Sequence, residues 1–208
     1  MKQSSTEHGL VPAGRVKIVS EQVLSDDWYL LKKYTFDFQR NDGSWQRQSR
    51  EAYDRGNGAA LLLYNLQQRS VVLTRQFRLP VYVSGSAHDG MLIEAAAGLL
   101  DNASPEHRIR HEAEEETGYR VDAVTPIFQA YMSPGSVTEK LHFFVAHYDA
   151  ASKVASGGGL EGEGEDIEVL ELPFDQALAM LRTGEIADAK TIMLLQYAAL
   201  HLFPGTAP

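Results

Sequence analysis

Four of the five residues from position 112 to 116 are glutamates, and the spacing of three of them is suited to metal chemistry. Glu112, Glu115 and Glu116 are three and four positions apart, so in a helix that turns about 100° per residue their carboxylates share one face. Three hard oxygen ligands on one rigid face suit Mg²⁺ or Mn²⁺. Blocks of like charge are also typical of a solvated surface, so both interpretations are open from spacing alone.

The segment around these glutamates carries clear helix start and stop signals. Ser104 is suited to cap a helix, Pro105 to occupy its first position, and Gly118 to end it. Apolar residues one turn apart predict that one side of this helix packs on a sheet. Further carboxylates follow in a glycine-rich stretch at 157–165, which we expect to form a mobile acidic loop able to supply another ligand.

Composition excludes several classes of protein. A formal net charge of −9 argues against general affinity for nucleic acid, whose binding depends on neutralising phosphates. With no cysteine, the chain has neither a disulfide framework nor a thiolate metal site. It has no apolar run of the roughly 18 residues that a membrane span needs, so a cytoplasmic protein without membrane contact is expected.

The order of hydrophobic patterns predicts two parts behind a flexible lead-in at residues 1–13. Residues 14–55 alternate apolar and polar side chains around a turn signal at 41–44, which predicts a small antiparallel module of about three strands. Residues 56–208 contain strand and helix patterns in an order that predicts an α/β/α sandwich with a mixed sheet. The expected strands are 59–64, 70–77, 91–97, 121–131, 140–148 and 167–172, and the expected helices are 104–117, 173–182 and 189–202.

The stretch from residue 97 to 121 resembles the Nudix box, G-x5-E-x7-R-E-U-x-E-E-x-G-U with U apolar. The matching residues are Gly98, Glu112, Ala113, Glu115, Glu116 and Gly118. Five other stretches resemble the GDP-mannose pyrophosphatase subgroup of this family, and the likeness as a whole covers the chain from about residue 23 to residue 200. These stretches are 50–58, 75–78, 131–135, 157–159 and 165–171.

Two residues depart from the general box. Ser104 stands near the position of the first glutamate, and His111 stands where the family has an arginine that orients a catalytic glutamate. Histidine, with a usual pKa near 6.5, would replace that arginine only partly at neutral pH unless nearby carboxylates raise its pKa. Neither change removes a metal ligand, so we expect activity with a lower rate or a more acidic optimum.

The resemblance implies a metal site and a set of catalytic roles. Mg²⁺, with Mn²⁺ as a second candidate, would bind Glu112, Glu116 and the backbone carbonyl of Ala97, with Glu165 joining from the glycine-rich loop. Glu115 would support these ligands, and Glu163 would act as the general base. For Glu163, an ordinary solvated loop residue is the alternative.

The resemblance also implies a substrate site built partly by a second subunit. The N-terminal strands of related enzymes cross to the partner, so we expect a homodimer with exchanged strands. For Arg78 a structural ion pair is the alternative role, and for Trp28 the alternative is a core or interface position. The expected substrate contacts are Trp28, Ser49, Arg50, Glu51, Arg78, Ala97, Gly98, Leu99, Glu139, Gly164 and Lys190.

The function implied is Mg²⁺-dependent hydrolysis of the pyrophosphate bond of a nucleoside diphosphate sugar, with GDP-mannose giving GMP and mannose 1-phosphate. An ADP-ribose or ADP-sugar pyrophosphatase would have the same metal site and is the first alternative. A Nudix domain that binds a nucleotide sugar but is catalytically weak is the second, and Ser104 and His111 motivate it.

Overall fold

The computed structural model describes residues 14–85, 89–160, 162, 164–203 and 205. The chain divides into two compact units, and the predicted lead-in at 1–13 lies outside the described residues. The first unit contains residues 14–55 together with Ser133–Thr138, and the second contains Gly56–Met132 and the chain from Glu139 onward. The N-terminal unit thus includes a segment, Ser133–Thr138, that is distant in the sequence.

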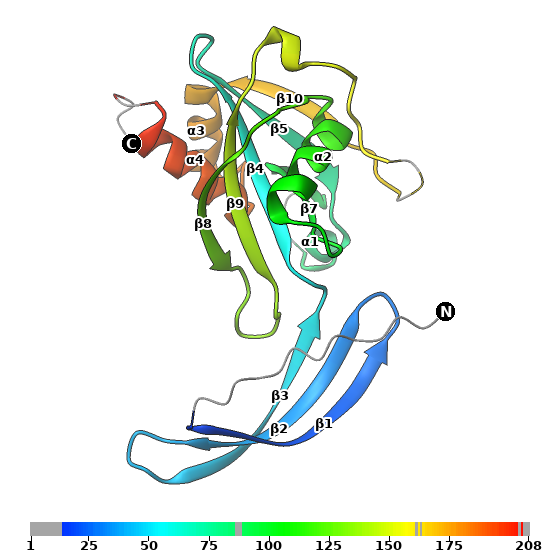
Figure 1. Cartoon of the computed structure of the whole chain (residues 1–208), viewed down its shortest axis with the longest axis vertical. Coiled ribbons are helices and arrows are strands. Elements are labelled where there is room, and N and C mark those ends of the chain that lie inside the picture. The colour runs from blue at the N-terminus through cyan, green and yellow to red at the C-terminus, as the bar shows by residue number, and fades with distance from the viewer. Residues whose placement is uncertain (1–13, 86–88, 161, 163, 204, 206–208) are drawn as a thin grey trace. The chain divides into compact units, whose positions relative to one another are not determined.

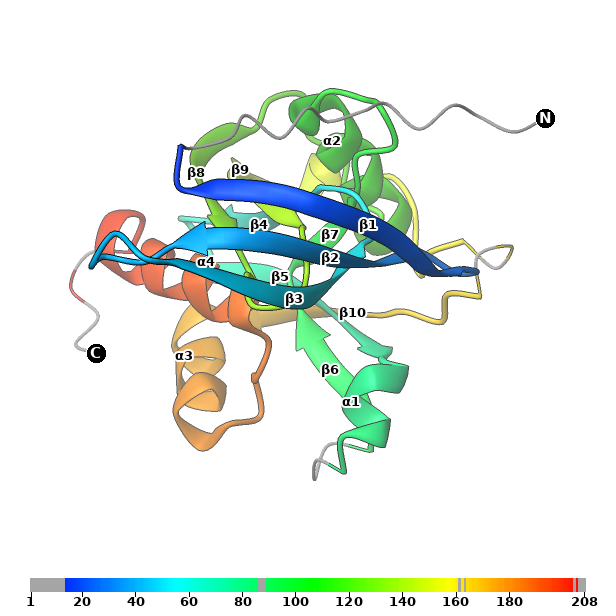
Figure 2. The same ribbon diagram turned by 90° about the horizontal axis from the view of Figure 1, so that it is seen from below.

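The N-terminal unit is a three-stranded antiparallel sheet, as the alternating pattern predicts. Strands β1 (Val16–Asp26), β2 (Leu30–Gln39) and β3 (Trp45–Asp54) lie side by side in chain order, as Figure 2 shows. Gly43, with φ of 86°, allows the tight turn between β2 and β3. None of the described residues of this unit is buried, so the sheet has no core of its own within one chain.

The second unit is built around a seven-stranded mixed sheet. Its main path is β10-β5-β4-β9-β8, with β6 paired to β5 and β7 paired to β4. Strands β4 and β9 run parallel, whereas the other pairs are antiparallel. The strands are β4 (Gly58–Asn65), β5 (Ser70–Phe77), β6 (Met91–Glu94), β7 (Ala96–Leu99), β8 (Thr125–Tyr131), β9 (Lys140–His147) and β10 (Glu168–Pro173).

Helices cover both faces of this sheet (Figure 1), because β4 is apolar on both sides. Ala59, Leu61 and Leu63 point to one face and pack with α2 (Pro105–Thr117). The intervening Ala60 and Leu62 point to the other face, where α3 (Phe174–Thr183) and α4 (Ala189–His201) cover them. This alternation follows from the two-residue period of a strand, and it confirms the predicted α/β/α sandwich.

Three local predictions need correction. The predicted strand 91–97 is two strands, because Ala95 donates its N–H to the Thr191 hydroxyl (2.7 Å) and the chain changes partner there from β5 to β4. A short helix, α1 (Leu79–Val83), was not predicted. Strand β8 begins at Thr125, not near residue 121. No helix in the described ranges has the length and apolar character needed to cross a membrane.

Candidate active site

Helix α2 carries the predicted acidic face and has the predicted ends. The Ser104 hydroxyl accepts the His107 N–H (3.3 Å), and Gly118 ends the helix with a left-handed φ of 74°. Because α2 packs on the sheet through the adjoining Ile109 and Ala113, Glu112 and Glu116 are turned away from solvent, with 7% and 2% of their surface exposed. A solvated acidic surface is therefore the wrong interpretation for these two glutamates.

Strand β7 lies directly against this acidic face. The Ala97 N–H donates to Oε2 of Glu116 (3.1 Å). A Cβ at Gly98 would lie 1.9 Å from Oε1 of Glu112, so only glycine allows the strand and the carboxylate to approach this closely. The structure thus brings together Ala97, Gly98, Glu112 and Glu116, four residues that the box pattern predicted as one site.

Glu116 is a buried carboxylate with little positive charge around it. Burial, followed by the nearby charges of Glu112 and Glu165, raises the pKa of Glu116 to about 8, although the Ala97 N–H and Arg78 act in the opposite direction. Two anionic groups that are costly to ionise together are suited to a divalent cation, which would stabilise both as carboxylates. The donor set therefore fits the predicted Mg²⁺.

Glu165 does not yet complete a set of ligands. Its Oε2 accepts the backbone N–H of Leu160 (2.9 Å) and lies beside Gly159. In the part of the chain that the structure describes, no three carboxylate or imidazole side chains are already gathered as a metal site. Glu165 would have to turn from the loop toward Glu116, which it already influences electrostatically.

The glycine-rich segment is attached to the end of α2. Gly158 donates its N–H to the Glu116 carbonyl (2.9 Å), and Gly159 donates to the Glu115 carbonyl (3.1 Å). The mobile loop that we predicted is therefore fixed at its first glycines. Gly164, with φ of 74°, is exposed farther along, and Glu163 lies outside the described residues.

Glu115 is half-buried beside this attachment. It lines a cleft of about 540 Å³ at the end of α2. The other lining residues are His111, Glu114, Arg120, Ala155, Ser156 and Gly157.

Arg108 is a site residue that sequence reasoning missed. Its Nη2 lies 2.6 Å from Oε1 of Glu112, one helical turn away, and its Nε donates to the Leu99 carbonyl (3.1 Å). His111, by contrast, is exposed and packs its ring on His107 at a centroid distance of 4.5 Å. The cation beside Glu112 is thus Arg108, and its four-residue spacing from Glu112 was the available signal.

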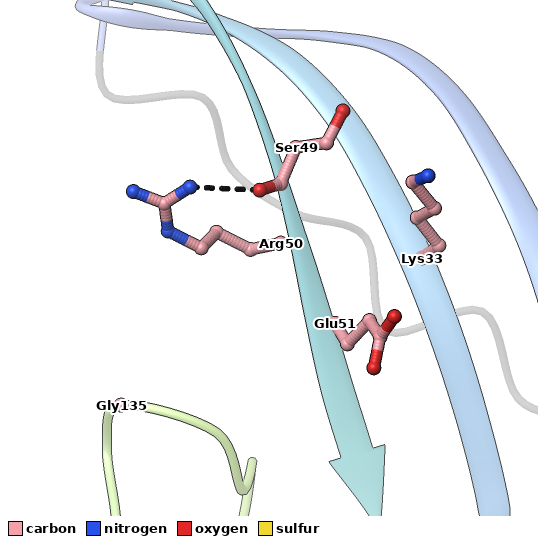
Figure 3. Close-up of a pocket in the computed structure, with 5 residues that line it drawn as sticks. All are labelled: Lys33, Ser49, Arg50, Glu51 and Gly135. Atoms are coloured by element: carbon pink, nitrogen blue, oxygen red, sulfur yellow. Dashed lines mark hydrogen bonds between the residues drawn. The ribbon is translucent and has the colours of Figure 1, made fainter.

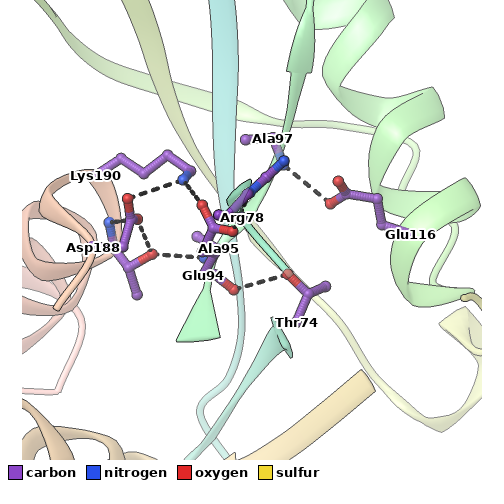
Figure 4. A network of polar contacts seen from close by, with 9 residues as sticks. Thr74, Arg78, Glu94, Ala95, Ala97, Glu116, Asp188 and Lys190 are labelled. Atoms are coloured by element: carbon purple, nitrogen blue, oxygen red, sulfur yellow. Dashed lines mark hydrogen bonds and ion pairs between the residues drawn. The ribbon is translucent and has the colours of Figure 1, made fainter. Parts of the chain in front are cut away.

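The predicted Arg78 and Lys190 meet at one buried carboxylate, that of Glu94 (Figure 4). Nε of Arg78 lies 2.7 Å from one Glu94 oxygen, and Nζ of Lys190 binds the other. Lys190 also lies 3.1 Å from Asp188, the cap of α4. The structural ion pair that was the alternative role for Arg78 is therefore present. Glu94, like Arg108, is a residue of this region that the sequence reasoning missed.

The remaining predicted contact in this unit is Glu139, which immediately precedes β9. A Cβ at Gly58 would lie 3.7 Å from Oε1 of Glu139 and 3.1 Å from the Gly98 carbonyl. Glu139 is half-buried, and its carboxylate and the Gly98 carbonyl both lie close to Gly58.

The predicted N-terminal contacts lie in the first unit. Ser49, Arg50 and Glu51 follow one another on β3 and line a shallow cavity of about 440 Å³ with Lys33 and Gly135, as Figure 3 shows. Trp28 is 81% exposed between β1 and β2, so a core position within one chain is wrong for it.

Comparison with known proteins identifies the fold and the family. The model of the NUDIX domain matches residues 54–195, which include β7, α2 and the buried glutamates. The chain belongs to the Nudix family. The model described as the GDP-mannose pyrophosphatase NudK N-terminal domain matches residues 15–53. The predicted family is therefore confirmed over nearly the whole described chain.

Relatives of similar length share more than half of their residues with this Nudix protein. A GDP-mannose pyrophosphatase of Pectobacterium atrosepticum is 58% identical, and the match covers 89% of this chain and 95% of the relative. One from Yersinia pestis is 56% identical over 92% of this chain and 96% of its own. A crystal structure of an ADP compounds hydrolase matches with a TM-score of 0.64 over 88% of this chain and 91% of that one. At 16% identity, that structure shows a shared fold.

Proposed function

We propose that this protein hydrolyses the pyrophosphate bond of GDP-mannose, with water as co-substrate, to give GMP and mannose 1-phosphate. The names of its relatives, which match it at 55–58% identity, support this substrate. So does the N-terminal match to a domain named for GDP-mannose pyrophosphatase. Water adds to one phosphorus, the bridging P–O bond breaks, and the two phosphomonoesters leave.

The proposal that the reaction depends on a metal ion is supported mainly by Glu112 and Glu116, which are buried together against β7. Together with the carbonyl of Ala97, these two carboxylates would hold Mg²⁺, or Mn²⁺, and Glu165 would join them from the loop. A bound divalent ion would neutralise the diphosphate and lower the pKa of a coordinated water. Glu116 is ready for this role because its proton, favoured by burial, can be exchanged for a cation.

The residues around the pair prepare it for the reaction. Arg108 fixes the orientation of Glu112 through its ion pair and through the Leu99 carbonyl. Glu115, half-buried beside the cleft at the end of α2, supports the acidic face. Glu163 is proposed as the general base that takes the proton of the attacking water.

We further propose a cytoplasmic homodimer in which the N-terminal strands complete the partner's substrate site. The first unit buries none of its described residues, and it exposes apolar side chains that a second copy would cover. Those side chains are Ile18, Val23, Leu24, Trp28 and Trp45. Trp28, Ser49, Arg50 and Glu51 would then contact the nucleotide, while Gly98, Leu99, Glu139, Gly164 and Lys190 would contribute from the other chain.

A substrate panel tests the proposal directly. The protein is incubated with Mg²⁺ and GDP-mannose, ADP-ribose or UDP-glucose, and the phosphorylated products are identified by ³¹P NMR. We expect GMP and mannose 1-phosphate to form fastest, and EDTA to stop the reaction. Faster cleavage of ADP-ribose would reassign the substrate to the ADP-sugar class. Binding of GDP-mannose without turnover would leave a nucleotide-sugar-binding domain.

The proposed base is tested separately from the metal. Glu163→Gln should lower kcat by about 10²- to 10⁴-fold, the range typical of a general base, while Mg²⁺ affinity stays unchanged. Glu185→Gln, in the exposed turn after α3, is the matched control and should leave kcat unchanged. A preserved rate in Glu163→Gln at saturating Mg²⁺ would exclude this residue as the base.

A further inference from the structure

Glu94 is a buried carboxylate that the Nudix box does not include. It is 3% exposed, and its two oxygens bind different cations, Arg78 through Nε (2.7 Å) and Lys190 through Nζ. Burial alone would raise the pKa of Glu94, but Lys190 and Arg78 outweigh burial and lower it. Glu94 is therefore an anion held at full charge in the interior, which is costly unless its partners are fixed.

The partners of Glu94 are held from two sides. Asp188 caps α4 by accepting the Thr191 N–H (3.0 Å) and hydroxyl (2.6 Å), and its other oxygen lies 3.1 Å from Nζ of Lys190. The Thr191 hydroxyl in turn accepts the Ala95 N–H, next to Glu94 in the sequence. Lys190 thus serves two carboxylates, and the network ties the start of α4 to the point where β6 ends.

Arg78 is the one member of the network that reaches solvent extensively. Its side chain is 40% exposed, whereas those of Glu94 and Lys190 are 4% and 12% exposed. Among the contacts of the described residues, the hydrogen bond of Arg78 to Glu94 uses Nε, and the terminal nitrogens Nη1 and Nη2 donate to no protein group. A guanidinium held by one edge presents its other edge in a fixed direction.

Arg78 lies between Lys190 and the acidic face that carries Glu116, as Figure 4 shows. Ala97, three residues after Glu94, donates to Glu116, so the same short stretch of chain supports both the arginine and the metal-binding carboxylate. Figure 4 shows these residues around the end of β6 and the start of β7.

We propose that Glu94 is a positioning residue for the diphosphate of the substrate: it holds the Nε edge of Arg78 so that the two terminal nitrogens bind a phosphate oxygen pair beside Glu116. This inference rests on the proposed function. Arginine binds phosphate through two parallel N–H donors, and that geometry is available only if the guanidinium does not rotate. Lys190, held by Asp188, keeps the second oxygen of Glu94 occupied and so fixes the direction of the first.

A double-mutant cycle on Glu94 and Arg78 tests this role. Glu94→Gln places an amide donor against Arg78 or Lys190, so we expect KM for GDP-mannose to rise by about 10- to 100-fold, the range for a hydrogen bond to a charged group, with a smaller change in kcat. Arg78→Gln should raise KM by at least as much. If Glu94 acts through Arg78, the double variant should match Arg78→Gln alone. Multiplicative effects in the double variant, or an unchanged KM in Glu94→Gln, would overturn the proposal.

Two controls separate positioning from folding. Glu168→Gln breaks an exposed Arg75–Glu168 ion pair on neighbouring strands of the same sheet, and it should leave KM unchanged. Glu94→Asp keeps the negative charge and shortens the side chain by one methylene, so it should fold and show a KM between those of the wild type and Arg78→Gln. It serves as the test variant if Glu94→Gln does not fold. A wild-type KM in Glu94→Asp would contradict the geometric argument.

The same cycle can be measured without turnover. Calorimetric binding of GDP in the presence of Mg²⁺ should show the same non-additive loss of affinity in the three variants. If the wild-type protein binds GDP but cleaves no nucleotide sugar, the proposed reaction fails, while the role of Glu94 is still decided by binding. Additive losses in GDP affinity would overturn the role of Glu94 even where the enzyme is active.

Discussion

Nη2 of Arg108 lies 2.6 Å from Oε1 of Glu112, across one turn of α2. The Nudix box places its arginine immediately before this glutamate, where the present chain has the exposed His111. In this structure the positive charge comes from Arg108, which lies three residues before His111 and on the same face of the helix as Glu112. A second contact, from Nε of Arg108 to the Leu99 carbonyl, fixes the arginine to β7.

Loss of Arg108 should therefore harm catalysis more than loss of His111. Arg108→Gln removes a charge-assisted hydrogen bond, and we expect kcat to fall by about 10- to 100-fold with the fold retained. His111→Gln, the matched control on the same helix, should stay within about twofold of the wild type because surface substitutions without buried partners have small effects. Steady-state kinetics of the two variants decide the point, and a larger loss in His111→Gln would reverse the assignment.

Glu116→Gln should abolish turnover and stabilise the metal-free protein. The pKa of Glu116 is about 8 in the folded protein and 4.5 in its ordinary environment. The unfolded chain thus ionises this group first, and the wild type loses stability as pH rises from about 4.5 to 8. One pKa unit corresponds to about 1.4 kcal/mol, so the variant should be more stable by about 2 to 4 kcal/mol at pH 8.

Thermal unfolding in EDTA checks the sign of this effect. At pH 8 the melting temperature of Glu116→Gln should exceed that of the wild type, and at pH 4 the two should coincide because the carboxyl is protonated in both states. Saturating Mg²⁺ should reverse the order at pH 8, since only the wild type gains binding energy. If the wild type and Glu116→Gln melt at the same temperature at pH 8 without metal, the raised pKa of Glu116 would be contradicted.

Gly98→Ala should disable the site with little effect elsewhere. The new methyl group would meet Glu112 at 1.9 Å, so the carboxylate must leave its position or β7 must move away from α2. We expect kcat to fall by at least about 100-fold, because small displacements of catalytic groups have effects of this size. Gly14→Ala, with no atom within 4 Å of the added Cβ, is the control. Full activity in Gly98→Ala would show that the close approach is not required.

Mixing two inactive variants tests the composite dimer. Arg50→Ala and Glu116→Gln change different halves of the proposed shared site. After subunit exchange, half of the dimers are heterodimers with one intact site each, so about a quarter of the wild-type activity should return. Sedimentation should show a dimer for each variant. If Arg50 and Glu116 serve the same chain's site, every heterodimer has two defective sites, and no activity should return.

Much of the site was readable from local patterns. The Ser104 cap, the Gly118 stop and the spacing of Glu112 and Glu116 follow from helix geometry, which depends on neighbours three and four residues apart. The apolar run at 59–64 likewise predicted a more buried strand, and β4 packs on both faces of the sheet. Both signals are local, and therefore the sandwich and the acidic helix were predicted correctly.

Whether that acidic face is solvated or buried was decided only by the tertiary structure. Burial of Glu116 to 2% exposure depends on how β7 packs against α2, and that packing joins segments separated by a loop. The ion pairs of Glu94 join residues 16 and 96 positions away, so no window of sequence contains them. The sequence alone determines which side chains share one face of a helix, because the helical repeat relates residues only three and four positions apart. Which charges meet in the interior is set by long-range packing, and here that packing places Arg108, Arg78 and Glu94 around the predicted glutamates.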